Sequence, residues 1–167
     1  MKRGISMSKI IQELEELTTS ILVNNDLLKI PANIIVVANN NDIEVHEEEL
    51  DKSISGAIRY DEKRKKFVIL INKNEPYVRR RFTLAHELGH FFLNGKELGD
   101  GNPHIDIMYR FSSETEKKVD YFAGALLMNK TLLQTIYQNN KSIRELAELF
   151  DVSESAMTVR LDILGLL

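Results

Sequence analysis

Cysteine is absent from this chain of 167 residues. Disulfide bonds are therefore excluded, and any metal site would have to use histidine and carboxylate side chains as ligands. The absence of thiols agrees with the reducing environment of the cytoplasm, which is where we expect the protein to act.

Long apolar runs are also missing. No segment approaches the roughly 18 consecutive apolar residues that a transmembrane helix needs, so we expect no membrane span. Near the start of the chain, the apolar residues from Ile10 to Leu17 are interrupted by glutamates, which argues against a signal peptide.

The chain has little net charge of either sign. Its formal charge is −3, so the composition does not indicate direct binding to nucleic acid. The hydrophobic fraction of 43% supplies enough apolar material for one compact core. We expect a single domain over 1–167, with a catalytic core in 1–128 and a helical subdomain in 129–167.

Hydrophobic periodicity predicts an α+β fold. Segment 8–24 has the spacing of an amphipathic helix, and the β-branched run 34–38 predicts a buried strand. Segments 55–60 and 66–71 predict two further strands joined by a hairpin. Together the strands would form a small mixed or antiparallel three-stranded sheet.

The remaining elements are expected to be helical. A helix is predicted over 75–94 and is expected to end at Gly95, and a second is predicted over 112–128 with Ser112 or Ser113 as its N-cap. Three short helices are expected to follow, at about 130–138, 142–150 and 153–164.

The pattern H-E-L-G-H at residues 86–90 carries the main chemical signal. On the predicted helix, His86 and His90 are four residues apart and share one face, so their rings could bind one zinc ion. Glu87 lies beside the first histidine and could act as general base toward a water at the metal. Catalytic zinc usually has three protein ligands, so a third must come from elsewhere in the chain.

The next predicted helix offers that third ligand. Glu116 and Asp120 are four residues apart, so both carboxylates would project from one face beside an apolar surface. We predict Glu116 as the ligand and Asp120 as the hydrogen-bond acceptor of a ligand histidine, with His86 as the expected donor. Two alternatives stay open at this point. Asp120 could be the ligand with Glu116 outside the shell, or both could be surface charges paired with Lys117 or Lys118.

Other polar residues are weaker candidates. His104 lies in the predicted loop between the two metal helices, where it could stabilise developing negative charge, although a lone loop histidine is more often a surface residue. Tyr121 is a similar candidate, and His46 lies among glutamates and is expected on the surface. In the same glycine-containing loop, Asp100 and Asp106 are weaker candidates for the third metal ligand, and Tyr109 and Arg110 are candidates for stabilising negative charge.

Two segments taken together, R-F-T-L-A-H-E-L-G-H at 81–90 and D-Y-F-A-G-A-L-L-M at 120–128, resemble the ImmA/IrrE family of zinc metallopeptidases. The likeness extends from about residue 34 to residue 167. It implies a zincin-like core in which His86, His90 and Glu116 bind Zn²⁺ and Glu87 is the catalytic base. It also implies a protein substrate, namely a helix-turn-helix repressor or antitoxin of a phage, mobile element, toxin–antitoxin or stress system. Val119 and Asn129 depart from the family pattern, which often has Ala and Pro there.

The C-terminal segment 142–167 looks like a helix-turn-helix. Its charge does not suit DNA, since Arg144 and Arg160 stand against five carboxylates, which gives 2 − 5 = −3. We therefore expect a packing or docking role for this segment.

Three hypotheses follow. The first is a zinc endopeptidase; the second is a zinc-containing module that regulates a repressor or antitoxin by binding without cleavage; the third, which the charge disfavours, is a DNA-binding regulator. The oligomeric state does not follow from the sequence.

Overall fold

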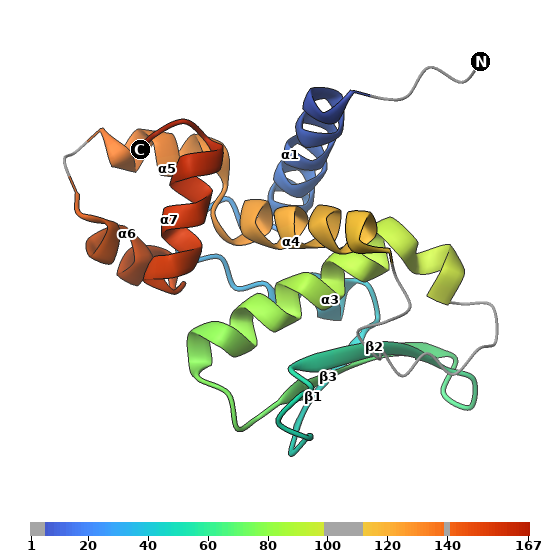
Figure 1. Cartoon of the computed structure of the whole chain (residues 1–167). Helices are drawn as coiled ribbons and strands as arrows, with labels where there is room; N and C mark the ends of the chain where they lie inside the picture. The colour runs from blue at the N-terminus through green and yellow to red at the C-terminus, as the bar shows by residue number, and fades with distance from the viewer. Residues whose placement is uncertain (1–5, 99–111, 139–140) are drawn as a thin grey trace.

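The computed structural model describes residues 6–98, 112–138 and 141–167. These form seven helices and one three-stranded sheet (Figure 1). In chain order they are α1 (Met7–Asn24), α2 (Ile35–Asn40), β1 (Glu44–Glu48), β2 (Gly56–Asp61), β3 (Lys66–Asn72), α3 (Tyr77–Leu98), α4 (Ser113–Leu127), α5 (Lys130–Tyr137), α6 (Ile143–Phe150) and α7 (Glu154–Ile163). A bilayer-spanning helix is not found in this part of the chain, since none of its helices combines the required length with the required apolar character.

The sheet is mixed, with strand order β1-β3-β2. The predicted hairpin is confirmed, because β2 runs antiparallel to β3 and pairs Ile58 with Ile69. Strand β1 runs parallel to β3 and pairs Val45 with Ile69. Within the described residues, β2 is therefore an edge strand that has a neighbour on one side only.

The predicted strand at 34–38 is wrong, because this segment leads into the short helix α2. Ile34, Val37 and Ala38 are almost fully buried, and their spacing of three and four residues is that of one helix face. Five consecutive apolar residues hide this period, so a short run fits either structure. Asn41 ends the helix by donating from its side chain to the Val37 carbonyl at 2.8 Å.

Helix α3 is the central element of the molecule. It lies between the sheet on one side and α4 on the other, and it packs against β2, β3 and α4 (Figure 1). Leu88 of α3 and Phe122 of α4 are both fully buried in the core between these layers. The predicted stop at Gly95 is wrong, since the helix continues to Leu98. The Leu98 side chain is buried, and this burial offsets the cost of about 1 kcal/mol of a glycine inside a helix.

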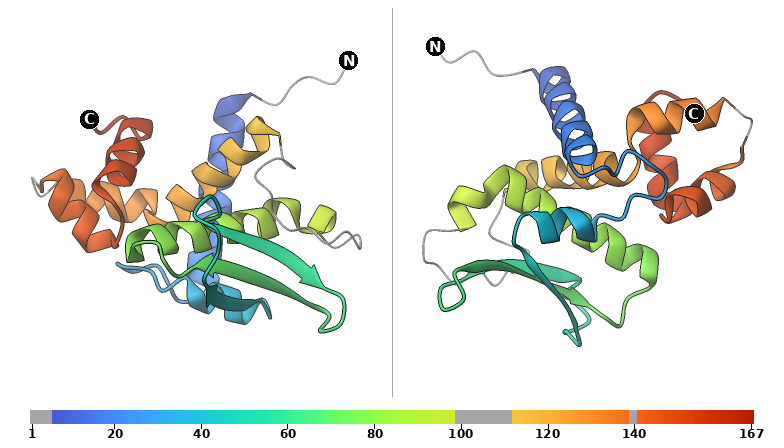
Figure 2. Two further views of the ribbon diagram at one scale, coloured as in Figure 1. Left: turned by 60° about the horizontal axis from the view of Figure 1, so that its bottom comes forward. Right: turned by 180° about the vertical axis from the view of Figure 1, so that it is seen from behind.

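Helix α4 begins where the sequence predicts. The Ser112 side chain accepts a hydrogen bond from the Thr115 backbone and caps the helix. Helix α1 packs against α4, and helices α5, α6 and α7 gather beyond the C-terminal end of α4 (Figures 1 and 2). Helices α3 and α4 pack against each other, and α3 carries the two motif histidines while α4 carries Glu116 and Asp120.

Candidate metal centre

The two motif histidines face each other along α3. His86 and His90 are one helical turn apart, and their Nε2 atoms lie 3.2 Å from each other. His90 is fully buried, whereas His86 is partly exposed at the side of the helix. Two ring nitrogens at this separation can both point at a single ion.

Glycine at position 89 allows α4 to approach this turn of α3. A Cβ atom placed at Gly89 would lie 3.0 Å from side-chain atoms of both Val119 and Phe122. That contact is tighter than side chains ordinarily make, so a larger residue would push the two helices apart. The small residue inside the motif is therefore what lets α4 bring its carboxylates to the histidines.

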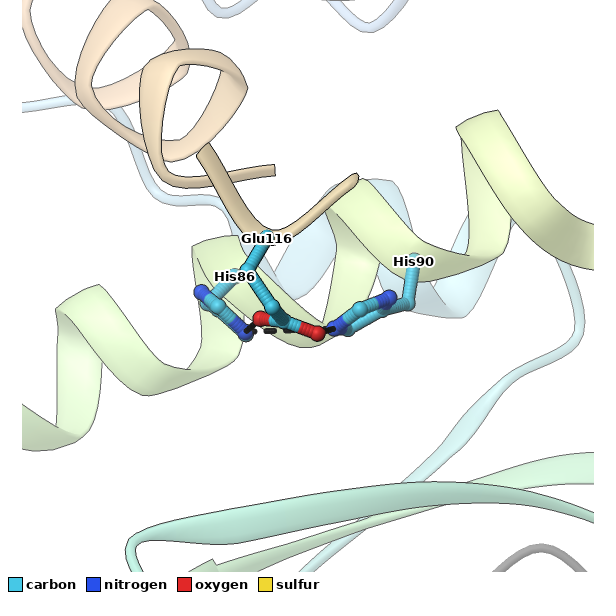
Figure 3. Close-up of side chains that lie close together, drawn as sticks. All are labelled: His86, His90 and Glu116. Carbon is cyan, nitrogen blue, oxygen red and sulfur yellow. Dashed lines mark hydrogen bonds and ion pairs between the residues drawn. The ribbon is translucent and has the colours of Figure 1, made fainter. Parts of the chain in front are cut away.

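Glu116 reaches across from α4 and completes the cluster. Its Oε2 lies 3.2 Å from His86 Nε2, and its Oε1 lies 3.4 Å from His90 Nε2 (Figure 3). The three potential ligand atoms all lie within 4.8 Å of one another. Figure 3 shows the carboxylate between the two rings.

The spacing of this cluster suits zinc. Zinc binds imidazole nitrogen and carboxylate oxygen at about 2.0–2.2 Å in a tetrahedron, so two of its ligand atoms are about 3.3 Å apart. The two ring nitrogens are 3.2 Å apart, and each lies 3.2 or 3.4 Å from one of the two Glu116 carboxylate oxygens; with one ligand atom per residue, all three lie within 4.8 Å of one another. Two imidazoles and one carboxylate, with a fourth position left over, also form a donor set that catalytic zinc sites use.

Asp120 supports the cluster from outside. Its Oδ1 lies 2.9 Å from His86 Nδ1, the ring nitrogen that does not face Glu116. Burial lowers the pKa of His86, but this hydrogen bond and the negative charges of Glu87, Asp120 and Glu116 outweigh burial and raise the pKa. With Nδ1 donating to Asp120, the Nε2 lone pair is directed into the cluster.

His90 is held in its neutral form. Burial, followed by the charge of the neighbouring His86, lowers the pKa of His90 to about 4. At neutral pH its ring is uncharged, which is the form that binds a metal ion.

We expect Asp120→Ala to weaken zinc binding by about 10- to 100-fold, the usual effect of removing a hydrogen-bond partner of a metal-binding histidine. Competition with a fluorescent zinc chelator measures this affinity. Glu114→Ala is the matched control, because Glu114 is exposed on the same helix and pairs with Lys118. Equal affinity of the Asp120 and Glu114 variants would contradict the role of Asp120.

Glu87 lies on the side of α3 that faces the sheet. Its side chain is almost fully buried, and it lines the same cavity as His86 and Glu116. A Cβ atom placed on Gly56 of β2 would lie 3.5 Å from Glu87 Oε1. The Glu87 carboxylate is therefore enclosed between α3 and the beginning of the edge strand.

Gly56 makes this close approach possible. A side chain there would collide with the Thr83 methyl group and would lie 2.8 Å from the backbone oxygen of Leu70. We expect Gly56→Ala to lower the free energy of unfolding by about 1–3 kcal/mol through overpacking. Urea denaturation measures this change. Gly95→Ala is the control: among the described residues no atom lies within 4 Å of its Cβ position, so added helix propensity should stabilise the protein by about 0.5–1 kcal/mol.

A cavity of about 1030 Å³ is lined by two members of the cluster, His86 and Glu116, while the third, His90, is fully buried next to His86. One wall is the beginning of β2 and the residues before it, Ser53 to Gly56. The floor is formed by α3 and α4, with the side chains of His86, Glu87 and Glu116. The opposite wall is formed by α7 and the turn before it. Neither wall was predicted from the sequence, because each depends on tertiary packing. The isolated glycine at the start of β2, Gly56, was the one available sign that another element approaches closely there.

None of the other sequence candidates is found within the histidine–glutamate cluster of the described residues. Tyr121 lines the cavity, but its hydroxyl donates to Glu15 Oε1 at 2.6 Å. Burial and this hydrogen bond raise the pKa of Tyr121 to about 12. His46 is on β1, where it contacts Glu44 at 3.3 Å. The remaining candidates, Asp100, His104, Asp106, Tyr109 and Arg110, lie outside the described residues.

Fold and site together define an α+β protein in which a helix bearing two histidines crosses a helix bearing a glutamate. The model of peptidase family M78, the IrrE N-terminal-like domain, matches residues 38–162, which is more than half of the chain. The chain therefore belongs to this metallopeptidase family, and the resemblance to ImmA/IrrE proteins is confirmed.

Among solved structures, one match is a Mycobacterium tuberculosis transcriptional regulator, with 16% sequence identity and a TM-score of 0.63. The match covers 90% of this chain and 46% of the regulator, so the chain spans about half the length of that protein. At this identity the likeness establishes the fold. A comparison with curated proteins finds no match.

Proposed function

We propose that the protein is a zinc-dependent endopeptidase. The observation that carries this proposal is the convergence of His86, His90 and Glu116 at zinc-compatible distances, beside a cavity that His86, Glu116 and Glu87 line. In this proposal the first three side chains hold the ion, Glu87 is the catalytic base and Asp120 orients His86.

When bound, zinc would polarise the carbonyl of the scissile bond and lower the pKa of a water molecule toward about 7. Glu87 would accept a proton from the attacking water as the water adds to the carbonyl carbon, and would pass that proton to the amine as the C–N bond breaks. A positioned base of this kind typically increases the reaction rate by a factor of about 10²–10⁴. Because Glu87 is enclosed by α3 and β2, bulk water has little access to its carboxylate.

The edge strand gives the substrate a place to bind. The beginning of β2 lines the cavity beside Glu87, and its outer side has no neighbouring strand within the described part of the chain. An extended segment of a protein substrate could pair its backbone with this edge, and its peptide bonds would then pass the cluster. This mode requires an extended or locally unfolded substrate segment.

The substrate we propose is a helix-turn-helix repressor or antitoxin-type regulator. Membership of the family supports this, together with the likeness of the fold to a transcriptional regulator. Helix α7 itself is poorly suited to DNA, because its single cation, Arg160, is buried and bound to Glu15.

The test uses the small helix-turn-helix protein encoded beside the gene, where one is present, incubated with the zinc-loaded chain. We expect discrete fragments by mass spectrometry, and none after a zinc chelator is added. A stable complex with an intact partner, unaffected by the chelator, would instead favour the non-proteolytic binding module.

A further inference from the structure

Helix α7 forms the wall of the cavity opposite the edge strand. Ala156, Val159 and Ile163 line the cavity, and their spacing of three and four residues places them on one face of the helix. The other face packs into the core through Met157 and Leu161, which are fully buried. The second helix of the helix-turn-helix is therefore turned toward the metal centre.

Apart from Ser155 and the buried Arg160, the cavity face of α7 is apolar, and it is open to solvent. Val159 is 58% exposed and Ile163 is 47% exposed, although both are large aliphatic side chains. Phe82 and Val78 of α3 line the same cavity and are half-buried. Exposed apolar side chains that gather in a concave site are typical of a binding surface.

This wall offers no charge to an anionic ligand. Arg160 lines the cavity but is 2% exposed, and its guanidinium binds both carboxylate oxygens of Glu15 at 2.7 and 3.0 Å. Arg79 lies on the α3 side, where it contacts Glu75 and Ser55. Contacts along α7 would therefore favour aliphatic side chains over phosphate groups.

Two arginines hold the wall in place. Arg160 also donates to the Met128 carbonyl at 3.0 Å, which joins α7 to the end of α4. Arg81 of α3 donates to the carbonyls of Asp151 and Ala32, at 3.1 and 3.2 Å, and so fixes the turn that precedes α7. A wall that is already ordered loses little entropy when a ligand binds.

We propose that the α7 face binds large aliphatic side chains of the protein segment whose backbone lies at the metal centre. This inference rests on the proposed function and narrows its substrate class. Val159 and Ile163 are separated by about 6 Å along the helix. Alternate residues of an extended chain are separated by about 6.6 Å. We therefore expect two aliphatic residues spaced two apart, close to the scissile bond.

The experiment selects ligands from a phage-displayed library of random twelve-residue peptides on the zinc-loaded Glu87→Gln chain. This variant removes the proposed base, so selection reports binding and does not depend on turnover. We expect enriched peptides to carry aliphatic residues at alternate positions. Enrichment of sequences without such residues, failure to enrich any peptide, or binding of a labelled single-stranded DNA alone would overturn the proposal.

The enriched peptides then test α7 directly. In the Val159→Ser/Ile163→Ser double variant we expect their affinity to fall about tenfold or more, because two apolar contacts are lost. Val23→Ser is the matched control, since Val23 is 55% exposed on α1 and does not line the cavity. Equal affinity of the double variant and the control would overturn the proposal.

Offering the same peptides to the wild-type chain tests peptidase activity separately. Peptides that bind through α7 but stay intact would contradict the proposed function and leave this inference standing.

Discussion

Replacing Glu87 by glutamine is expected to reduce cleavage by about 10²–10⁴-fold while zinc stays bound. The amide has nearly the size of the carboxylate, so the buried position between α3 and β2 remains filled. It cannot accept a proton from the attacking water, however, and the metal-binding atoms belong to other side chains. Initial rates of fragment formation, measured beside the zinc content of the same sample, separate the two effects.

The control for this variant is Glu114→Gln. Glu114 is an exposed glutamate in the first turn of α4, where it pairs with Lys118 at 3.0 Å. We expect cleavage by this variant to match the wild type. Near-normal turnover by Glu87→Gln would remove Glu87 from the mechanism, and loss of zinc from it would mean that Glu87 supports the metal.

Replacing Arg160 by methionine is expected to lower the free energy of unfolding by about 3–5 kcal/mol. Glu15 would keep its charge in a nearly buried position without the cation that neutralises it. The Met128 carbonyl would also lose its donor. Since small domains are stable by only about 5–15 kcal/mol, the variant would be close to unfolding. Urea denaturation followed by circular dichroism measures the loss.

Two further variants separate charge from packing at this position. Arg144→Met removes an exposed arginine that pairs with Glu148 in the next turn, and we expect a change below about 1 kcal/mol. Glu15→Gln combined with Arg160→Met removes both charges and should recover part of the loss. If Arg160→Met lowers the free energy of unfolding no more than Arg144→Met does, the buried pair of Arg160 and Glu15 does not stabilise the protein.

Helices α3 and α4, which carry the proposed metal ligands, were the part of the fold that the sequence predicted best. The pattern at 86–90 requires a helix, and the spacing of Glu116 and Asp120 requires a second one, so local periodicity was enough. The structure places those carboxylates beside the histidines, as the prediction required, and gives them different ring nitrogens. Their roles as ligand and orienting group remain predictions.

Features that depend on distant parts of the chain could not be predicted. Arg160 looked like one of two cations in an acidic segment, yet its partner, Glu15, lies in α1 at the other end of the chain. Strand β1 was missed because its sequence, E-V-H-E-E, carries three glutamates. As an edge strand it has a neighbouring strand on one side only and none of its residues is fully buried, so its sequence lacks the apolar pattern that predicts a strand.

The acidic composition of β1 has a consequence for self-association. An exposed strand edge is a template for pairing with another copy, and charged side chains along an edge discourage this. Two copies meeting through antiparallel β1 strands would bring Glu48 of each toward Glu44 of the other, a like-charge contact that the pairing of Glu44 with Arg64 only partly offsets. The β2 edge has no such protection where it enters the cavity at Gly56. Within the described sheet, an incoming strand would meet no charged side chain over 56–58 of β2, and any tendency of the protein to aggregate through its sheet would compete with substrate for that same part of the edge.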